Sequence, residues 1–98
     1  MLTSPFVFGA RMSEGSATAI VLLNTDIGSE DEVLEQLSRI DGVIEASVVY
    51  GVYDVVVKVR AKTIEELKEI ITNRIRKLSK VKSTLTMIVV EGKTFEKK

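Results

Sequence analysis

The sequence predicts a single α+β domain, built as a four-stranded antiparallel sheet with two helices on one face. Its 98 residues leave room for one hydrophobic core. The hydrophobic share of 45% is too high for a disordered chain. Short β-rich runs and two segments of helical periodicity follow one another in the order strand, helix, strand, strand, helix, strand.

The first strand and the first helix are marked by an apolar run and a capping pattern. Residues 18–25, TAIVLLNT, form a continuous β-rich stretch of strand length. Ser29 and Glu32 then have the spacing of a capping box, in which each side chain bonds a backbone N–H of the first helical turn. The pattern predicts a helix over 30–40.

One face of this helix is apolar. Val33, Leu37 and Ile40 recur at spacings of four and three residues, which places them on one side. Gly42 follows directly and can adopt the left-handed conformation that ends a helix. We therefore expect this face to pack on the sheet.

The next two strands are predicted to form a hairpin. Residues 43–50 and 53–60 are β-rich, and only Gly51 and Val52 separate them. A two-residue connection that begins with glycine suits a type II′ turn, which joins antiparallel strands.

The second helix repeats the pattern of the first. Thr63 and Glu66 form another capping box, and the spacing predicts a helix over 64–78, followed by a strand over 84–91. The apolar face of this helix consists of Ile64, Leu67, Ile71, Ile75 and Leu78.

The resulting βαββαβ order predicts the ferredoxin-like arrangement, because right-handed crossovers place both helices on one face. We assign the domain to residues 17–92, with a mobile arm over 1–16 and a frayed tail over 93–98. Within the arm, Met12 is an alternative start of the chain. Phe6, Val7 and Phe8 are an alternative short strand or a contact to a neighbouring subunit.

The second face of the sheet is also predicted to be apolar. Apolar residues lie on both sides of three strands. They are Ala19, Val21 and Leu23 opposite Ile20 and Leu22, Val55, Val57 and Val59 opposite Val56, and Leu85, Met87 and Val89 opposite Ile88 and Val90. Leaving several hundred Å² of apolar surface in water would lose on the order of 10 kcal/mol of burial free energy, at about 25 cal/mol per Å². We therefore expect a homodimer formed sheet to sheet, the alternative cover being the arm folded under the sheet.

Composition excludes several classes of function. Fourteen basic and 14 acidic residues balance, which argues against a protein that mainly binds nucleic acid. The absence of Cys and His removes thiol chemistry, soft-metal sites and the most common general base, so we expect no cofactor and no metal. No apolar run is long enough for a membrane span, and we expect a cytoplasmic protein. The abundance of Lys and Glu fits a thermophilic source.

Three segments together resemble a known family. Residues 40–43 read Ile-Asp-Gly-Val, residues 49–57 read Val-Tyr-Gly-Val-Tyr-Asp-Val-Val-Val, and residues 81–86 contain Val-x-x-Thr-x-Thr. In this register they resemble the ligand-binding half of Lrp/AsnC-type regulators, the RAM domain (regulation of amino-acid metabolism). Those regulators carry an N-terminal helix-turn-helix domain, and nothing before Thr18 could form one. The resemblance therefore implies a stand-alone sensing module that does not bind DNA itself.

The resemblance also implies a ligand site, a higher assembly and a partner. Family dimers assemble further, commonly into octamers, and bind small effectors, usually amino acids, between dimers. A full-length Lrp/AsnC regulator is the implied protein partner. The residues carried over as ligand-binding are Gly51, Val52, Tyr53, Asp54, Thr84 and Thr86.

The chemistry of these residues suits an amino acid. The carboxylate of Asp54 can hold an ammonium group, and turn amides with threonine hydroxyls can hold a carboxylate. The alternative is structural: Gly51 satisfies a turn, Tyr53 packs, Asp54 caps the turn, and Thr84 and Thr86 mark the hydrophilic face of an edge strand.

Two other functions fit the fold. A small dimeric enzyme of the monooxygenase or isomerase type would have only Asp54, Tyr50 or Tyr53 as its acid or base, since there is no His. An RNA-binding module of RRM type needs stacking aromatic residues, which the first and third strands lack centrally. The basic run Arg74, Arg76, Lys77, Lys80 and Lys82 is interpreted as a solvated surface.

Overall fold

The computed structural model describes residues 16–97. The predicted arm, with Met12 and the segment from Phe6 to Phe8, lies outside the described residues except for Ser16. The elements are β1 (Ala17–Thr25), α3 (Glu30–Leu37), β2 (Val43–Val48), β3 (Val55–Ala61), α4 (Ile64–Ile70), the π-helical turn η1 (Ile71–Ile75) and β4 (Val81–Ile88).

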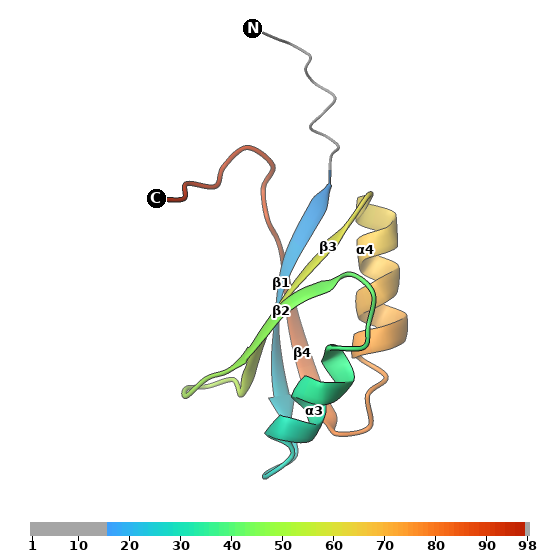
Figure 1. Cartoon of the computed structure of the whole chain (residues 1–98), viewed down its shortest axis with the longest axis vertical. Coiled ribbons are helices and arrows are strands. Elements are labelled where there is room, and N and C mark those ends of the chain that lie inside the picture. The colour runs from blue at the N-terminus through green and yellow to red at the C-terminus, as the bar shows by residue number, and fades with distance from the viewer. Residues whose placement is uncertain (1–15, 98) are drawn as a thin grey trace, which may run out of the picture.

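The predicted four-stranded antiparallel sheet is confirmed. Its strand order is β2-β3-β1-β4, and every neighbouring pair is antiparallel. The first and last strands of the chain therefore lie side by side, as Figure 1 shows. The edges of the sheet are β2 and β4, so each of these strands has one side without a neighbouring strand among the described residues.

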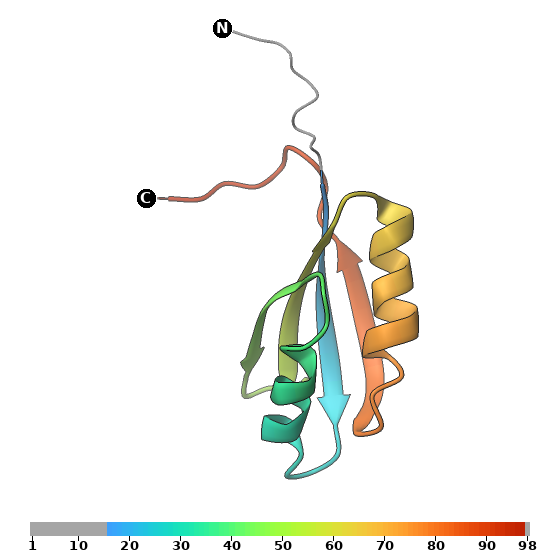
Figure 2. The same cartoon turned by 45° about the vertical axis from the view of Figure 1, so that its right-hand side comes forward.

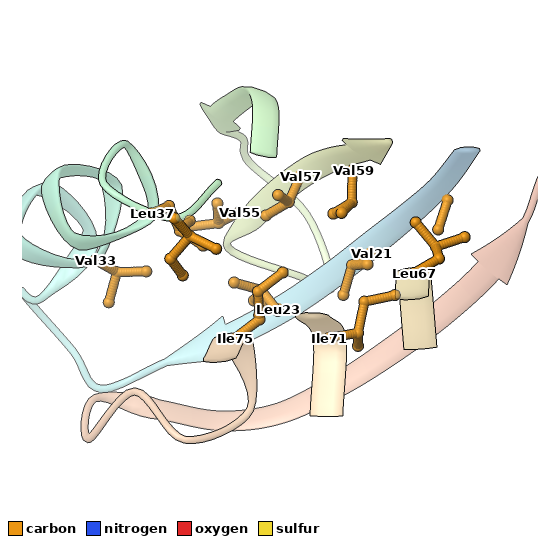
Figure 3. Packing of buried hydrophobic residues seen from close by; sticks show 12 residues of the cluster. Val21, Leu23, Val33, Leu37, Val55, Val57, Val59, Leu67, Ile71 and Ile75 are labelled. Carbon is orange, nitrogen blue, oxygen red and sulfur yellow. The ribbon is translucent and has the colours of Figure 1, made fainter. Parts of the chain in front are cut away.

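Both helices supply side chains to one hydrophobic core, and the predicted ferredoxin-like fold is confirmed. Alternate residues of β1 and β3 are buried, and they face side chains of α3, α4 and η1 (Figure 3). The fully or nearly buried apolar residues are Ala19, Val21, Leu23, Val33, Leu37, Ile40, Val55, Val57, Val59, Leu67, Ile71 and Ile75.

Helix α3 begins where it was predicted but without the predicted capping box. Ser29 precedes the helix with φ −104° and ψ 9°, and its side chain makes no capping hydrogen bond. This backbone conformation is not the extended one from which a side chain reaches the amides of the first turn. The helix is also shorter than predicted, because Arg39 and Ile40 donate to carbonyls three residues back, in tighter turns.

Helix α4 has the predicted cap in modified form. The Glu66 N–H donates to Oγ1 of Thr63 at 3.0 Å, as predicted. The Glu66 carboxylate accepts from the N–H of Lys62 at 3.3 Å, one residue before the position a capping box uses. Ile64 is 45% exposed, so its predicted place on the buried face is wrong.

The continuous α-helix predicted to reach residue 78 is interrupted. After Ile70 the chain continues as the π-helical turn η1, in which the N–H of Arg76 donates to the carbonyl of Ile71 at 2.9 Å. A π turn holds one residue more than an α turn. The buried pair Ile71 and Ile75 satisfies both kinds of helix, so the apolar spacing does not separate them.

The predicted two-residue hairpin turn is wrong. β2 ends at Val48 and β3 begins at Val55, so residues 49–54 connect the strands. The N–H of Val49 donates to the carbonyl of Asp54 at 2.9 Å and closes the loop. The reason lies in Asp54, whose other polar groups bond to β1 and hold it out of a tight turn.

Gly42 occupies the left-handed position predicted after the first helix, with φ +99°. A Cβ at this residue would lie 2.7 Å from Cδ1 of Ile70 and 3.2 Å from the carbonyl oxygen of Arg60. Glycine is therefore required both by the backbone conformation and by close packing against α4 and β3.

We expect Gly42→Ala to lower the free energy of unfolding by about 1–3 kcal/mol, through backbone strain and overpacking. Urea or thermal unfolding measures the loss. Gly28→Ala is the matched control, because Gly28 has φ +80° but a Cβ there meets nothing within 4 Å. Equal losses in the two variants would show that the contact with Ile70 contributes nothing.

Candidate functional site

Asp54 anchors the hairpin loop to the end of β1. Its N–H donates to the carbonyl of Leu23 at 2.9 Å, and its carboxylate oxygen Oδ2 accepts from the N–H of Thr25 at 2.9 Å. With the bond from Val49, the residue joins β1, β2 and β3. The carboxylate thus has a structural role, but it bonds to the end of β1 rather than capping its own turn as the alternative interpretation had it. A ligand at Asp54 would share this carboxylate with the backbone amide of Thr25.

The rest of the hairpin loop is open to solvent. Gly51 has φ +148°, and a Cβ there would meet nothing within 4 Å, so another molecule can approach its backbone closely. Tyr50 and Val52 are fully or almost fully exposed, while Tyr53 is half-buried. Figure 2 shows this loop beyond the end of β2, where it forms one corner of the domain.

Thr84 and Thr86 lie on the helix side of β4. They pair with Leu23 and Val21 of β1, whose side chains are buried in the core. The threonines themselves stay accessible, because α4 packs on β1 and β3 rather than on the edge strand. This placement agrees with both interpretations of the pair, the hydrophilic edge strand and the ligand site.

A groove of about 440 Å³ opens between the second helical segment and β4. Figure 2 shows α4 and β4 running alongside each other in opposite directions. The groove is lined by Lys68, Ile71, Thr72, Arg76, Thr84, Thr86 and Ile88. Its lining includes both predicted threonines and none of the hairpin residues. Within one chain, the structure thus does not bring the two halves of the predicted site into the same cavity.

Three polar residues of this groove were not singled out as a site from the sequence. Lys68, Thr72 and Arg76 are spaced four residues apart, a spacing that places residues on one helical face. The basic run was interpreted as a solvated surface. Arg74, Arg76 and Lys77 are all exposed, as that interpretation requires, and Arg76 also lines the groove. The sequence signal that could have identified these residues is their regular spacing of four, in a helix that precedes the strand with Thr84 and Thr86.

The outer face of the sheet has an apolar centre with a polar rim. Leu22 lies between Val56 and Leu85 in the strand register, and Ile20 pairs with Met87. Leu85 and Met87 are 45% and 43% exposed, and the other three are half-buried. The rim includes Thr18, Asn24, Glu45, Lys58, Arg60 and Ser83. The apolar second face predicted from the sequence is confirmed.

The described residues contain neither a candidate metal site nor a candidate membrane span. Among residues 16–97, no three side chains of His, Cys, Asp or Glu gather in a way that could hold a metal ion. No helix in that same stretch has the length and apolar character needed to cross a bilayer.

Comparison with known proteins places this geometry in a family. The model of the Lrp/AsnC ligand binding domain matches residues 18–95. Uncharacterised HTH-type transcriptional regulators of Pyrococcus furiosus and Pyrococcus horikoshii are each 39% identical over 74 residues, which cover 72% of this chain and 49% of each regulator. The chain spans about half the length of these curated relatives.

Solved structures show the same fold. The chain is 44% identical to FFRP-DM1, with a TM-score of 0.73 over 76% of this chain and 99% of that one. The hypothetical protein PHS023 from Pyrococcus horikoshii is also 44% identical, with a TM-score of 0.72 over 76% of this chain and 89% of that one. AsnC of E. coli, at 23% identity, shares the fold with a TM-score of 0.75 over 83% of this chain and 55% of that one.

A shorter match reaches an enzyme. The homocitrate synthase of Sulfurisphaera tokodaii is 48% identical over 59 residues, which are 60% of this chain but only 13% of the synthase. The family model, in contrast, extends from the first strand to beyond the last, and it contains the hairpin loop, both threonines and the outer sheet face. The chain therefore belongs to the family of Lrp/AsnC ligand binding domains.

Proposed function

We propose that this chain is a small-molecule sensing and oligomerisation module of the Lrp/AsnC type. It binds an amino-acid effector between copies of itself. Through a protein partner, rather than by binding DNA itself, it modulates transcription regulation or amino-acid metabolism.

The separation of the two halves of the predicted site is the observation that carries this proposal. Asp54 and the open loop around Gly51 lie at the hairpin, whereas Thr84 and Thr86 line a groove that the hairpin does not enter. A ligand bound in the groove contacts no hairpin residue of the same chain, because none of them lines that groove. An effector that uses both contacts must therefore lie where the hairpin of one copy meets the groove of another.

The apolar outer face supports self-association. Its centre consists of large aliphatic side chains, two of which are more than 40% exposed in a single chain. Polar and charged residues surround it, which is the usual pattern of an interface core with a polar rim. Two copies placed face to face would bury these side chains and form a symmetric dimer. Such dimers are the units of the higher assembly, with the octamer as the family precedent.

The kinds of relatives support a role in control rather than catalysis. The matching regulators are named as HTH-type, and the chain corresponds to about half of their length. The segment shared with homocitrate synthase is too small a part of that enzyme to contain its chemistry. A domain common to regulators and to a synthase is best explained as one that senses metabolites. A full-length Lrp/AsnC regulator, which would contribute DNA binding, is the partner we propose.

Effector binding and assembly are linked in this scheme. A ligand held between copies binds only the associated state, so it stabilises that state by mass action. The effector thereby changes the oligomeric state of the module, and the partner responds to this change in assembly.

We expect Leu85→Glu to dissociate the dimer, because it places a charge at the centre of the buried sheet face. Analytical ultracentrifugation at micromolar concentration should show a monomer for the variant and a dimer or larger species for the wild type. Ile64→Glu is the matched control, since Ile64 is also 45% exposed but lies at the start of α4. A monomeric wild type, or equal dissociation of both variants, would contradict the proposed interface.

We expect at least one of the standard amino acids to raise the melting temperature of the wild type. Asp54→Asn should lower the affinity for that amino acid about tenfold or more. The variant loses the charge that pairs with the ammonium group. Asparagine keeps an oxygen that can accept from the amide of Thr25, so the hairpin anchor is preserved. Unliganded unfolding curves check the fold, and full affinity in Asp54→Asn would remove this residue from the site.

A further inference from the structure

We propose that the groove between the second helical segment and β4 is, by itself, a binding site for a small organic carboxylate with an aliphatic body. Every residue of the site comes from one chain. The proposal goes beyond the amino-acid site between copies, with which it shares Thr84 and Thr86, because it requires neither Asp54 nor a second copy.

The groove exists because the second helical segment covers only the inner strands. α4 packs on β1 and β3, and β4 at the edge keeps its helix-side face open. The resulting space of about 440 Å³ has the volume of a small-molecule site.

The polar lining of the groove favours an anion. Lys68 and Arg76 supply positive charge, and three threonines supply hydroxyl donors. No acidic residue belongs to the lining. Within residues 16–97 the salt bridge found is between Arg39 and Glu35, at a distant helix, so neither groove cation is neutralised by an ion pair there.

The positive charge is strongest at the end of the groove near the turn that precedes β4. A second hollow of about 330 Å³ shares Arg76 and Thr84 with the groove and adds Lys82 and Ser83. Arg76 thus stands at the boundary of both spaces. A guanidinium beside a threonine hydroxyl can bind a carboxylate through two parallel N–H donors and one O–H donor. We place the carboxylate of the ligand at this end.

The π turn contributes to this arrangement. In a regular α-helix, residues eight apart are about 80° out of line, because each residue advances about 100°. Lys68 and Arg76 are eight apart, but η1 lies between them. Its wider turn takes less rotation per residue, which returns Arg76 toward the face that carries Lys68 and Thr72. Such insertions into helices are frequent at functional sites.

The apolar lining defines the rest of the ligand. Ile71 is almost fully buried and forms part of the hydrophobic core, while Ile88 is 39% exposed toward the far end of β4. An aliphatic chain that extends from the carboxylate would run along the groove toward these residues. The ammonium group of an amino acid, in contrast, finds no carboxylate in the groove. The site alone therefore prefers an aliphatic acid or 2-oxo acid to an amino acid of the same skeleton.

The test uses 4-methylpentanoate and its neutral amide, 4-methylpentanamide, titrated calorimetrically into the full chain. We expect the carboxylate to bind at least tenfold more tightly than the amide. Binding should weaken as salt is added, because charge contributes to it. Equal affinity for both compounds, or binding of neither, would overturn the proposal.

Two arginines of the same turn provide the matched variants. Arg76→Gln should weaken the binding of 4-methylpentanoate at least tenfold, and Thr84→Val should weaken it severalfold without a change in side-chain volume. Arg74→Gln should leave the affinity unchanged, because Arg74 belongs to η1 but not to the groove lining. Equal effects of Arg74→Gln and Arg76→Gln would show that only the overall charge matters, and would also overturn the assignment.

The carboxylate site and the proposed amino-acid function can fail separately. Asp54→Asn and Leu85→Glu should retain the affinity for 4-methylpentanoate. If these variants keep their affinity for 4-methylpentanoate but no amino acid raises the melting temperature of the wild type, the groove site is supported and the proposed function is contradicted. Loss of carboxylate binding in the monomeric Leu85→Glu variant would show that the site needs two copies, which contradicts the groove as a site within one chain.

Discussion

Two short helices cannot cover both faces of a four-stranded sheet, and this limit determines every surface of interest in the molecule. α4 packs on β1 and β3, which leaves the helix-side face of β4 open and creates the groove. No helix of residues 16–97 lies on the opposite face of the sheet, yet the centre of that face is apolar. The open edge provides a site for a ligand, and the bare face provides a surface for a second copy.

The order of the elements and most of the core follow from the sequence, because they depend on local periodicity. The alternation in β1 and β3 put Val21 and Val57 on one of two apolar faces, and the structure buries that face in the core. Features that depend on distant residues could not be predicted in this way. The hairpin is wider than two residues because Asp54 bonds to Thr25, which is 29 residues away in the chain. The π turn could not be predicted, because the spacing of Ile71 and Ile75 suits both an α-helix and a π-helix.

The candidate site was predictable only in part. A family resemblance pointed to Thr84 and Thr86, and the structure places both in the groove. Lys68 and Arg76 belong to the same groove, but their sequence context is that of ordinary helix surface charges. Their significance depends on where α4 sits above the sheet, and that position is decided by tertiary packing rather than by local pattern. Arg74, two residues before Arg76 and also exposed, consequently does not line the groove.

The anchoring of the hairpin by Asp54 has a mechanical consequence. The amide that its carboxylate holds belongs to Thr25, and the next residue, Asp26, donates its N–H to the carbonyl of Lys80 at 2.9 Å. Lys80 immediately precedes β4, the strand that carries Thr84. The hairpin loop and the entrance to the last strand are thus fastened to the same two-residue stretch of backbone. A displacement of the hairpin loop would therefore strain hydrogen bonds next to those that position the start of β4.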